Sequence, residues 1–399
     1  MTGGMHRYVS AVRARTGWLI AGVIVALAVL PFVRQALSPN GTSLDARVYR
    51  DAARAFLGFG DIYAQRFDGL PFTYPPFAVL PFTLLAVLPA AVALVLMFAL
   101  SSASLVAVVR WCQQYVTGGD AGPWWATVAL AGAAALVLEP VTMTLGFGQV
   151  NLILLALVLG VDARATRWAG VGAGIAAAVK VTPGLLVVAQ LVRGDLRAFR
   201  RGALAFLAAT AVAALVAPSA TFTYFGHLLW DSNRPGNLAY LQNQSLRAVV
   251  ERHAPGHQSL WLALALVALV LGAAAVRVHR RDAFAALTAA GVTALLVSPV
   301  SWSHHWVWVL PVTAVGLRAA RRTPLRWASL ALLGVCAATT WLWRDVPALP
   351  GEDLYVVAGL VWLVAAIVTR PAVASDPERA SVDVVVDRDL ADPDALPTR

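Results

Sequence analysis

Two aspartates in one short polar segment are the first residues that could do chemistry. Asp45 and Asp51 both lie in the sequence LDARVYRDAARAFL. A carboxylate can act as a general base and remove the proton from an attacking hydroxyl group. The alternative is that both aspartates are solvated or pair with the arginines of the same segment, Arg47, Arg50 and Arg54.

A single lysine is the candidate for binding an anion. Lys180 is the only lysine beside thirty arginines, and it begins the sequence KVTP inside an otherwise apolar run. A buried ammonium group is costly without a partner of opposite charge. A substrate phosphate would be such a partner, and the amino end of a half-helix would assist it. The alternative is that Lys180 pairs with a protein carboxylate or extends to the membrane interface.

Two adjacent histidines lie between tryptophans. The sequence SPVSWSHHWVW contains His304 and His305. Tryptophans are ordinary at a membrane interface, but anchoring does not explain the histidines. Neighbouring histidines on a helix point in different directions and no third ligand is evident, so a metal site has little support. We expect the pair to hydrogen-bond to a phosphate or a sugar, and we expect no metal or other cofactor.

Further polar and aromatic groups suit a sugar phosphate. The sequence NRPGNLAYLQNQSLRAVV contains Asn243 and Arg247. Amide groups and an arginine match hydroxyl and phosphate groups. Tyr74, in the sequence FTYPPF, could stack on a sugar, whereas the two prolines beside it are expected to form a structural corner. Glu139, directly before Pro140 at a helix end, is a further candidate base.

The composition places most of the chain in a lipid bilayer. Of its 399 residues, 59% are hydrophobic and 13% are charged, and the mean hydropathy is +0.70. Soluble domains contain roughly 45–50% apolar and about 25% charged residues. The net charge of +10 arises from arginines in short clusters between apolar runs, which is typical of cytoplasmic anchors. We therefore expect a membrane protein among membrane lipids, with no nucleic-acid partner.

The pattern of apolar runs predicts an all-α polytopic membrane protein with about twelve transmembrane or re-entrant helices and both termini inside. The run 168–192 has arginines at both ends, which one crossing does not satisfy. We therefore predict a re-entrant pair of half-helices that breaks at 180–183. The other predicted spans are residues 18–33, 90–110, 124–145, 149–161, 202–217, 259–276, 283–299, 306–317, 326–343 and 354–369.

The least membrane-like segments are all predicted to face outward and to converge. They are residues 38–76, 139–151, 218–258 and 298–305. Within the first of them, Val48, Ala52, Ala55 and Phe56 recur at helical spacing, which predicts a short amphipathic helix on the membrane surface. A transporter would place its decisive polar groups near the bilayer midplane. In this chain most charges lie at helix ends instead, which favours catalysis at the outer membrane face.

The chain divides into a membrane body and a tail. Residues 1–370 are expected to form one catalytic domain, with its larger outer loops at 38–76 and 218–258. Residues 371–399 hold seven acids and three arginines. Such a polar, proline-punctuated segment is expected to be a disordered acidic tail in the cytoplasm.

Six motifs in order resemble glycosyltransferase family 87, the polyprenol-phosphate-mannose-dependent α-(1→2)-mannosyltransferases of actinobacteria. The likeness runs from about residue 18 to residue 370. The motifs are DARVYRDAA, FTYPPF, GQVNLILL, KVTP, NQSLR and SPVSWSHHWVW. The third adds Gln149 and Asn151 to the candidate site residues.

The resemblance implies a GT-C membrane fold with a catalytic aspartate in the first outer loop. By its position in the motif, that aspartate is Asp45, and the family's histidine pair would be His304 and His305. The implied donor is polyprenyl-phosphate mannose. The implied acceptor is a phosphatidylinositol mannoside or a related lipoglycan such as lipomannan, mannosylated outside the plasma membrane.

The residues fit that chemistry on their own terms. A lipid phosphate is already a good leaving group, so one carboxylate is enough to take the acceptor proton during an inverting displacement. Lys180, Arg247 and a histidine could neutralise the charge that grows on the departing phosphate. A divalent metal would then be unnecessary.

Two rivals remain open. A related GT-C transferase could move arabinose or glucose from a similar carrier, because a few hydroxyl contacts decide the sugar. A polytopic transporter or flippase of a polyprenyl-linked sugar would move the same lipid without forming a glycosidic bond.

Overall fold

The computed structural model describes residues 2–37, 43–164, 167–231, 234, 236–345 and 352–369. This part is predominantly helical, as expected for an all-α membrane protein. The predicted acidic tail, 371–399, lies outside the described residues, as does the start of the first outer loop, 38–42.

The elements of the first half of the chain are α1 (Thr2–Leu37), α2 (Leu44–Leu57), β1 (Arg66–Phe67), β2 (Leu70–Pro71), η1 (Pro76–Ala78), α3 (Val79–Val87), α4 (Ala90–Thr117), α5 (Trp124–Val137), α6 (Glu139–Phe147), α7 (Asn151–Val161), α8 (Val171–Val179) and α9 (Gly184–Arg193). Those of the second half are α10 (Leu196–Val216), α11 (Pro218–Gly226), η2 (Leu228–Trp230), α12 (Leu246–His253), α13 (Gln258–Val278), α14 (Ala283–Val297), η3 (Ser303–Trp308), α15 (Val309–Arg318), α16 (Pro324–Asp345) and α17 (Leu354–Val368). β1 and β2 form one short antiparallel hairpin.

Four of the described helices are long and apolar enough to cross a bilayer. They are the part of α1 from Val9 to Leu30, and α4, α10 and α13. The shorter apolar helices include α7, α9, α14 and α17. α14 lies in the centre, and every residue from Phe284 to Leu296 is buried. Short apolar helices around a buried centre are tolerated in a membrane where the protein itself covers their backbone.

The predicted re-entrant pair is present as α8 and α9. Three glycines mark where the pair contacts α10. At the start of α8, a Cβ on Gly170 would clash with the Ala198 carbonyl of α10, and further along α8 a Cβ on Gly174 would clash with the Gly202 carbonyl. A Cβ on Gly202 of α10 would lie 3.0 Å from Val187 of α9. α8 therefore runs parallel to α10 and α9 returns antiparallel to it. Both ends of the pair lie beside the first turns of α10, and the break at 180–183 lies deep in the protein.

The predicted span 124–145 is not one helix. The chain bends by 86° between α5 and α6, because Leu138 has extended backbone angles and Pro140 lies in the first turn of α6. A proline is well tolerated in the first turn of a helix, but it has no N–H group to donate to the carbonyl four residues earlier and its ring clashes with that carbonyl, so α5 cannot continue through Pro140 as a regular helix.

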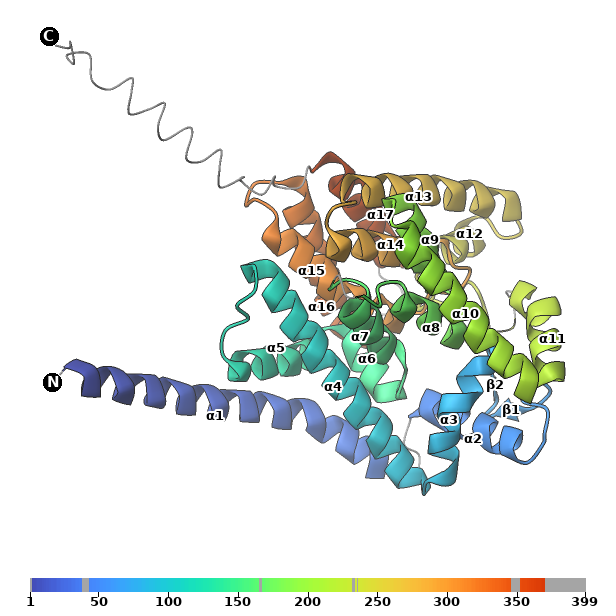
Figure 1. Cartoon of the computed structure of the whole chain (residues 1–399), viewed down its shortest axis with the longest axis horizontal. Helices are drawn as coiled ribbons and strands as arrows, with labels where there is room; N and C mark the ends of the chain where they lie inside the picture. Colours follow the sequence, from blue (N-terminus) through green and yellow to red (C-terminus); the bar gives the residue numbers. More distant parts are fainter. Residues whose placement is uncertain are drawn as a thin grey trace, which may run out of the picture.

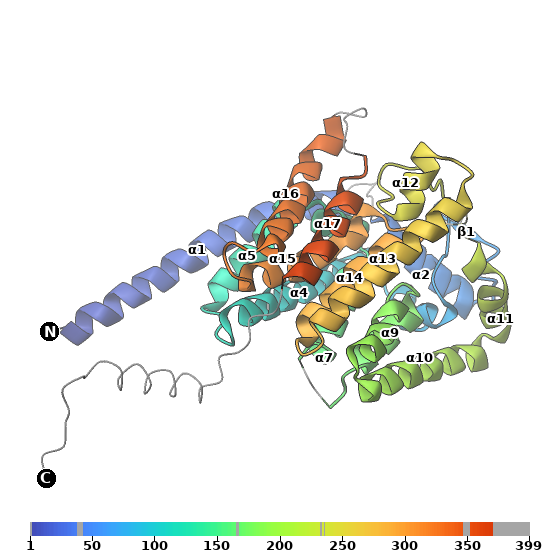
Figure 2. The same ribbon diagram turned by 90° about the horizontal axis from the view of Figure 1, so that it is seen from above.

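The predicted surface helix is α2, but its apolar face packs on protein. Val48 and Ala52 are buried, and the Tyr49 ring stacks on Phe82 of α3 with centroids 4.3 Å apart. In Figures 1 and 2, α2, β1, α11 and α12 gather at the right-hand end of the molecule, away from the N-terminus. The segments that the sequence predicts to face outward therefore lie together.

Candidate active site

A cavity of about 620 Å³ lies where these segments meet. Its walls come from α2, the stretch 70–75, the α6–α7 turn, the α8–α9 break, the loop 224–242 and the stretch 298–305. Seven of the sequence-predicted site residues belong to the two cavities described here. Asp45, Tyr74, Gln149, Lys180, His304 and His305 line this one. Asn151 lines a smaller adjoining cavity of about 50 Å³, shared with Lys180 and His305.

Asp45 lies in the first turn of α2 and faces the cavity. Burial raises the pKa of its carboxyl group to about 6, although a hydrogen bond from the Gln149 amide and the charge of Lys180 act to lower it. A carboxylate with this pKa is a stronger base than an exposed aspartate and is still mostly ionised at neutral pH.

The arginines of α2 are engaged elsewhere. Arg47 pairs with Asp68 at 2.9 Å, Arg50 donates to the Leu88 carbonyl and Arg54 to the Ala86 carbonyl. Asp51 lies 3.4 Å from Arg50, and its side chain is 41% exposed. Pairing with a neighbouring arginine, the alternative raised by the sequence, therefore describes Asp51, whereas among the described residues no salt bridge to Asp45 is found.

Close packing places Asp45 beside the α6–α7 turn. Gly148 has a positive φ of 67°, and a Cβ there would lie 2.6 Å from the Cβ of Ala46. Only glycine permits both this backbone conformation and this approach. The next residue, Gln149, then lies within reach of the Asp45 carboxyl group.

Gln149 also fixes two tyrosines. Its Oε1 accepts hydrogen bonds from the Tyr49 hydroxyl at 2.7 Å and from the Tyr74 hydroxyl at 3.0 Å, and the two hydroxyls lie 2.6 Å apart. With Oε1 taken by the tyrosines, the amide nitrogen is left for Asp45. The aromatic wall of the cavity and the orientation of Asp45 therefore depend on one amide group.

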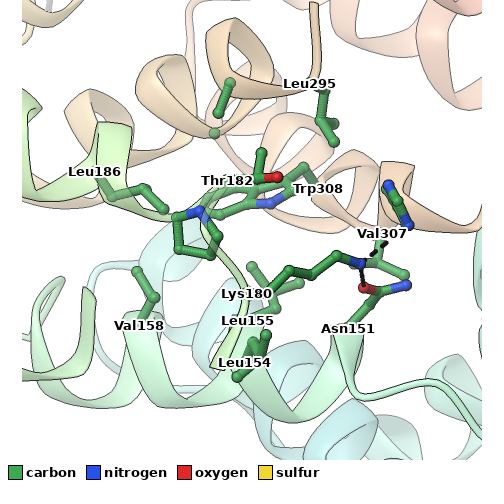
Figure 3. A pocket seen from close by; sticks show the side chains of 14 residues that line it. Asn151, Leu154, Leu155, Val158, Lys180, Thr182, Leu186, Leu295, Val307 and Trp308 are labelled. Carbon is green, nitrogen blue, oxygen red and sulfur yellow. Dashed lines mark hydrogen bonds between the residues drawn. The ribbon is translucent and has the colours of Figure 1, made fainter. Parts of the chain in front are cut away.

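Lys180 directly follows α8, and its Nζ lies 5.7 Å from the centre of the Tyr74 ring. Its Nζ donates to Asn151 Oδ1 at 2.9 Å and lies 3.0 Å from His305 Nε2. Figure 3, a close view of the smaller adjoining cavity, shows the lysine side chain extending to Asn151, with Leu154 and Leu155 near its stem. An ammonium group has three donors, so one remains for a ligand. The described residues pair it with no carboxylate.

Hydrogen bonds to a backbone carbonyl fix the position of the segment that contains His304 and His305. The His304 carbonyl accepts hydrogen bonds from Thr144 Oγ1 at 2.8 Å and from Asn151 Nδ2 at 2.9 Å. Asn151 thus connects this segment to Lys180. His304 itself lines the cavity, and its buried Nε2 has no hydrogen-bond partner among the described residues. A buried polar atom of this kind is costly unless a ligand or water pairs with it.

Four predicted candidates lie outside the two cavities. Glu139 is buried and accepts hydrogen bonds from Ser303 at 2.6 Å and Tyr355 at 2.9 Å. Arg247 pairs with Glu251 at 2.7 Å and lies over the Trp261 ring.

The other two are Asp51, described above, and Asn243. Asn243 is buried, and its side chain binds backbone groups of Leu238, Pro299 and Ser301. It fixes the shape of the outer loop and does not line the cavity.

The sequence did not single out several residues of the site. Tyr49 follows Asp45 by four residues, so their shared helix face was a usable signal. Thr144 gave no signal, because only the packing of α6 against η3 brings it to the histidine segment. Asp231, Tyr240, Gln242 and Trp302 also line the cavity.

The cavity brings together two kinds of chemical group. They are the basic carboxylate of Asp45 and the cation of Lys180, which lies between an amide and an imidazole. The first can deprotonate a hydroxyl group and the second can stabilise an anion. Within the part of the chain that the structure describes, no three His, Cys, Asp or Glu side chains form a metal-ligand group.

Comparison with protein families gives a match to the model of glycosyltransferase family 87 over residues 72–299. One relative, from Mycobacterium tuberculosis (strain ATCC 25618 / H37Rv), is 31% identical over 84% of this chain and 82% of its own. It is named polyprenol-phosphate-mannose-dependent alpha-(1-2)-phosphatidylinositol mannoside mannosyltransferase. A second, from strain CDC 1551 / Oshkosh, is named as the corresponding phosphatidylinositol pentamannoside mannosyltransferase and is 32% identical over 85% and 83%.

The chain is also similar to a solved structure, that of ArnT from Cupriavidus metallidurans in the apo state. The TM-score is 0.37 at 20% sequence identity, and the match covers 89% of this chain and 77% of that one.

Proposed function

The chain belongs to glycosyltransferase family 87, and we propose that it transfers mannose from polyprenyl-phosphate mannose to a lipid-anchored mannoside, forming α-(1→2) linkages. The acceptor would be of the phosphatidylinositol mannoside or lipomannan type, as the names of the relatives suggest. The observation that carries the proposal is the one cavity that both Asp45 and Lys180 line.

Asp45 is the base in this mechanism. Its carboxylate accepts the proton of the acceptor hydroxyl while that oxygen attacks the anomeric carbon of the mannose. The bond from the anomeric carbon to the phosphate oxygen breaks on the opposite face, so the reaction proceeds with inversion. The polyprenyl phosphate departs as an anion and requires no proton from the protein.

Lys180 stabilises that departing anion. Asn151 and His305 hold its ammonium group in place, so the charge is oriented before the reaction begins. Preorganised charges of this kind stabilise a transition state better than mobile ones. His304 Nε2, which lacks a protein partner, is available to the sugar or the phosphate. No step requires a metal ion.

We further propose that the reaction takes place at the outer face of the plasma membrane. One helix, α9 or α15, separates each of the arginine-rich connections Arg193–Arg201 and Arg318–Arg326 from a segment that lines the cavity. Positively charged loops favour the cytoplasm, which supports a cavity on the outer side.

The experiment is a transfer assay with purified protein in lipid nanodiscs. Radiolabelled polyprenyl-phosphate mannose is supplied with a phosphatidylinositol mannoside acceptor, and the lipid products are separated. We expect labelled acceptor whose label is released by an α-(1→2)-specific mannosidase. Parallel reactions contain the arabinose or glucose derivative of the same carrier.

Two results would contradict the proposal. Transfer of arabinose or glucose in preference to mannose would establish a transferase of another sugar. In proteoliposomes, movement of the labelled carrier across the bilayer without a new glycosidic bond would establish a transporter.

A further inference from the structure

A third cavity lies at the other end of α10, on the surface of the helix bundle. Its volume is about 530 Å³, and it is lined by Arg167, Trp168 and Val171 from the start of α8 and by Arg201, Leu204, Ala205 and Ala208 from α10. It shares no residue with the candidate active site. α10 is one of the candidate membrane spans, so this groove faces lipid.

The groove has a charged end and an apolar wall. Arg201, Leu204, Ala205 and Ala208 follow one another at helical spacing, so they lie on one face of α10 with the arginine nearest the helix start. Because α8 runs parallel to α10, Arg167 and Trp168 lie beside that same end. The large apolar side chains Trp168 and Leu204 are 57% and 65% exposed.

The acidic residues near this groove in sequence, Asp162 and Asp195, already have partners within the protein. Both Asp162 oxygens accept hydrogen bonds from backbone N–H groups at the start of α8. Asp195 pairs with Arg193 at 2.6 Å and caps α10 at Ala198. Among the described residues neither Arg167 nor Arg201 forms a salt bridge. Arg167 lies over the Trp168 ring at 5.5 Å, and the charge of Arg201 helps to lower the pKa of Asp195. Both guanidinium groups can therefore still pair with an outside anion.

The surrounding charge has the same sign. A neighbouring surface groove of about 550 Å³ is lined by Arg193, Arg197, Arg200 and Arg280, with Asp195 among them. An anion at Arg167 and Arg201 therefore lies in a positive field. Basic grooves of this type between membrane helices suit anionic lipid head groups.

We propose that this groove binds one phospholipid with an anionic head group. Its phosphate lies between Arg167 and Arg201, and an acyl chain follows Leu204, Ala205 and Ala208 along α10. A soluble anion or an acidic peptide would satisfy the arginines but would leave the apolar wall uncovered. The site is separate from the catalytic cavity and is independent of the sugar that the protein transfers.

The test measures lipid retention. The full-length protein is delipidated in mild detergent, incubated with phosphatidylglycerol or with phosphatidylcholine, and examined by native mass spectrometry. We expect the wild type to retain one phosphatidylglycerol and to retain phosphatidylcholine weakly. The double variant Arg167→Gln/Arg201→Gln should retain about tenfold less phosphatidylglycerol, because it lacks two of the contributing charges.

Two further variants separate the parts of the proposal. Ala208→Trp, at an exposed position, should reduce retention by filling the acyl path without changing any charge. The control Arg321→Gln/Arg322→Gln removes two exposed arginines from another loop and should behave as the wild type.

Three results would overturn the proposal. In the first, the wild type retains phosphatidylglycerol and phosphatidylcholine equally. In the second, the wild type and the Arg167→Gln/Arg201→Gln variant retain phosphatidylglycerol equally. In the third, phosphatidylglycerol is retained only after residues 371–399 are deleted. The last would show that the acidic end of the chain occupies the groove.

Discussion

Asp45 is suited to act as a base by its surroundings more than by its chemical type. Burial disfavours its charged form and raises its pKa to about 6, while Gln149 and Lys180 keep part of the stabilisation that the carboxylate needs. Asp51, only six residues later, is exposed beside Arg50. Two identical side chains on one helix thus have different roles available to them.

This pKa predicts the pH dependence of transfer. Because the base must be deprotonated, kcat/KM should rise with pH through about 6 and then level off. Lys180→Met removes a positive charge that lowers the pKa of Asp45, so the rise should move to higher pH and the plateau should be lower. The measurement is the initial rate of mannose transfer across about pH 5–8 in both proteins.

Asp51→Asn is the control for that profile. It alters an exposed carboxylate on the same helix and should leave the position of the rise unchanged. A Lys180→Met profile that rises at the same pH as the wild type would contradict the electrostatic coupling of Lys180 to Asp45.

The candidate site was predictable where the residue types were unusual for a membrane. A lone lysine and a histidine pair stand out in an apolar chain, and both reached the cavity. Arg247 did not, because α12 presents it to Glu251, one helical turn later, and to Trp261. The Arg247–Glu251 spacing was visible in the sequence, but the neighbouring helix that takes up the side chain was not.

At the scale of elements, tight turns set the distances between the candidate catalytic groups. The α8–α9 break brings Lys180 to the cavity, and the glycine turn between α6 and α7 brings Gln149 to Asp45. Sequence patterns identified the first break from the conflict between its flanking arginines. They missed the bend at Leu138, although Pro140 marks it, because the apolar run continues across it.

The glycine turn gives a prediction with a matched control. Gly148→Ala and Gly118→Ala both place an alanine at positive φ, at a cost of about 1–2 kcal/mol each. Only Gly148 has a neighbour, Ala46, in the way, whereas nothing lies within 4 Å of the Gly118 position. Gly148→Ala should therefore lower kcat about tenfold or more by displacing α2, since small misplacements of catalytic groups are costly.

Thermal unfolding and transfer rate are measured together for these two variants. Similar losses of stability with a loss of rate in Gly148→Ala alone would agree with the expected role of the turn. Equal rates in the two variants would show that the contact of Gly148 with α2 does not position Asp45.

At the scale of the whole molecule, helices pack around α14, and among the described residues a cavity of about 620 Å³ lies where the predicted outer segments meet. The alternation of apolar runs and arginine clusters was enough to predict this overall order. It was not enough to show that α2 packs on α3, because an apolar helix face looks the same in sequence whether lipid or protein covers it.

Cysteine labelling tests the proposed orientation. In a variant whose own cysteines, Cys112 and Cys336, are replaced by serine and alanine, Gln65→Cys should react with a membrane-impermeant maleimide on intact cells. Arg322→Cys should react only after the cells are permeabilised. Both positions are exposed in the structure. The reverse pattern would place the cavity on the cytoplasmic side.

The central claim is that Asp45 is the base, and the most direct measurement compares Asp45→Asn with Asp51→Asn in the transfer assay. Both changes remove one negative charge from α2, and both proteins are first checked for normal insertion and thermal unfolding. We predict that Asp45→Asn lowers kcat about 10³-fold, whereas Asp51→Asn stays within about twofold of the wild type. Full activity in a folded Asp45→Asn protein would contradict the assignment.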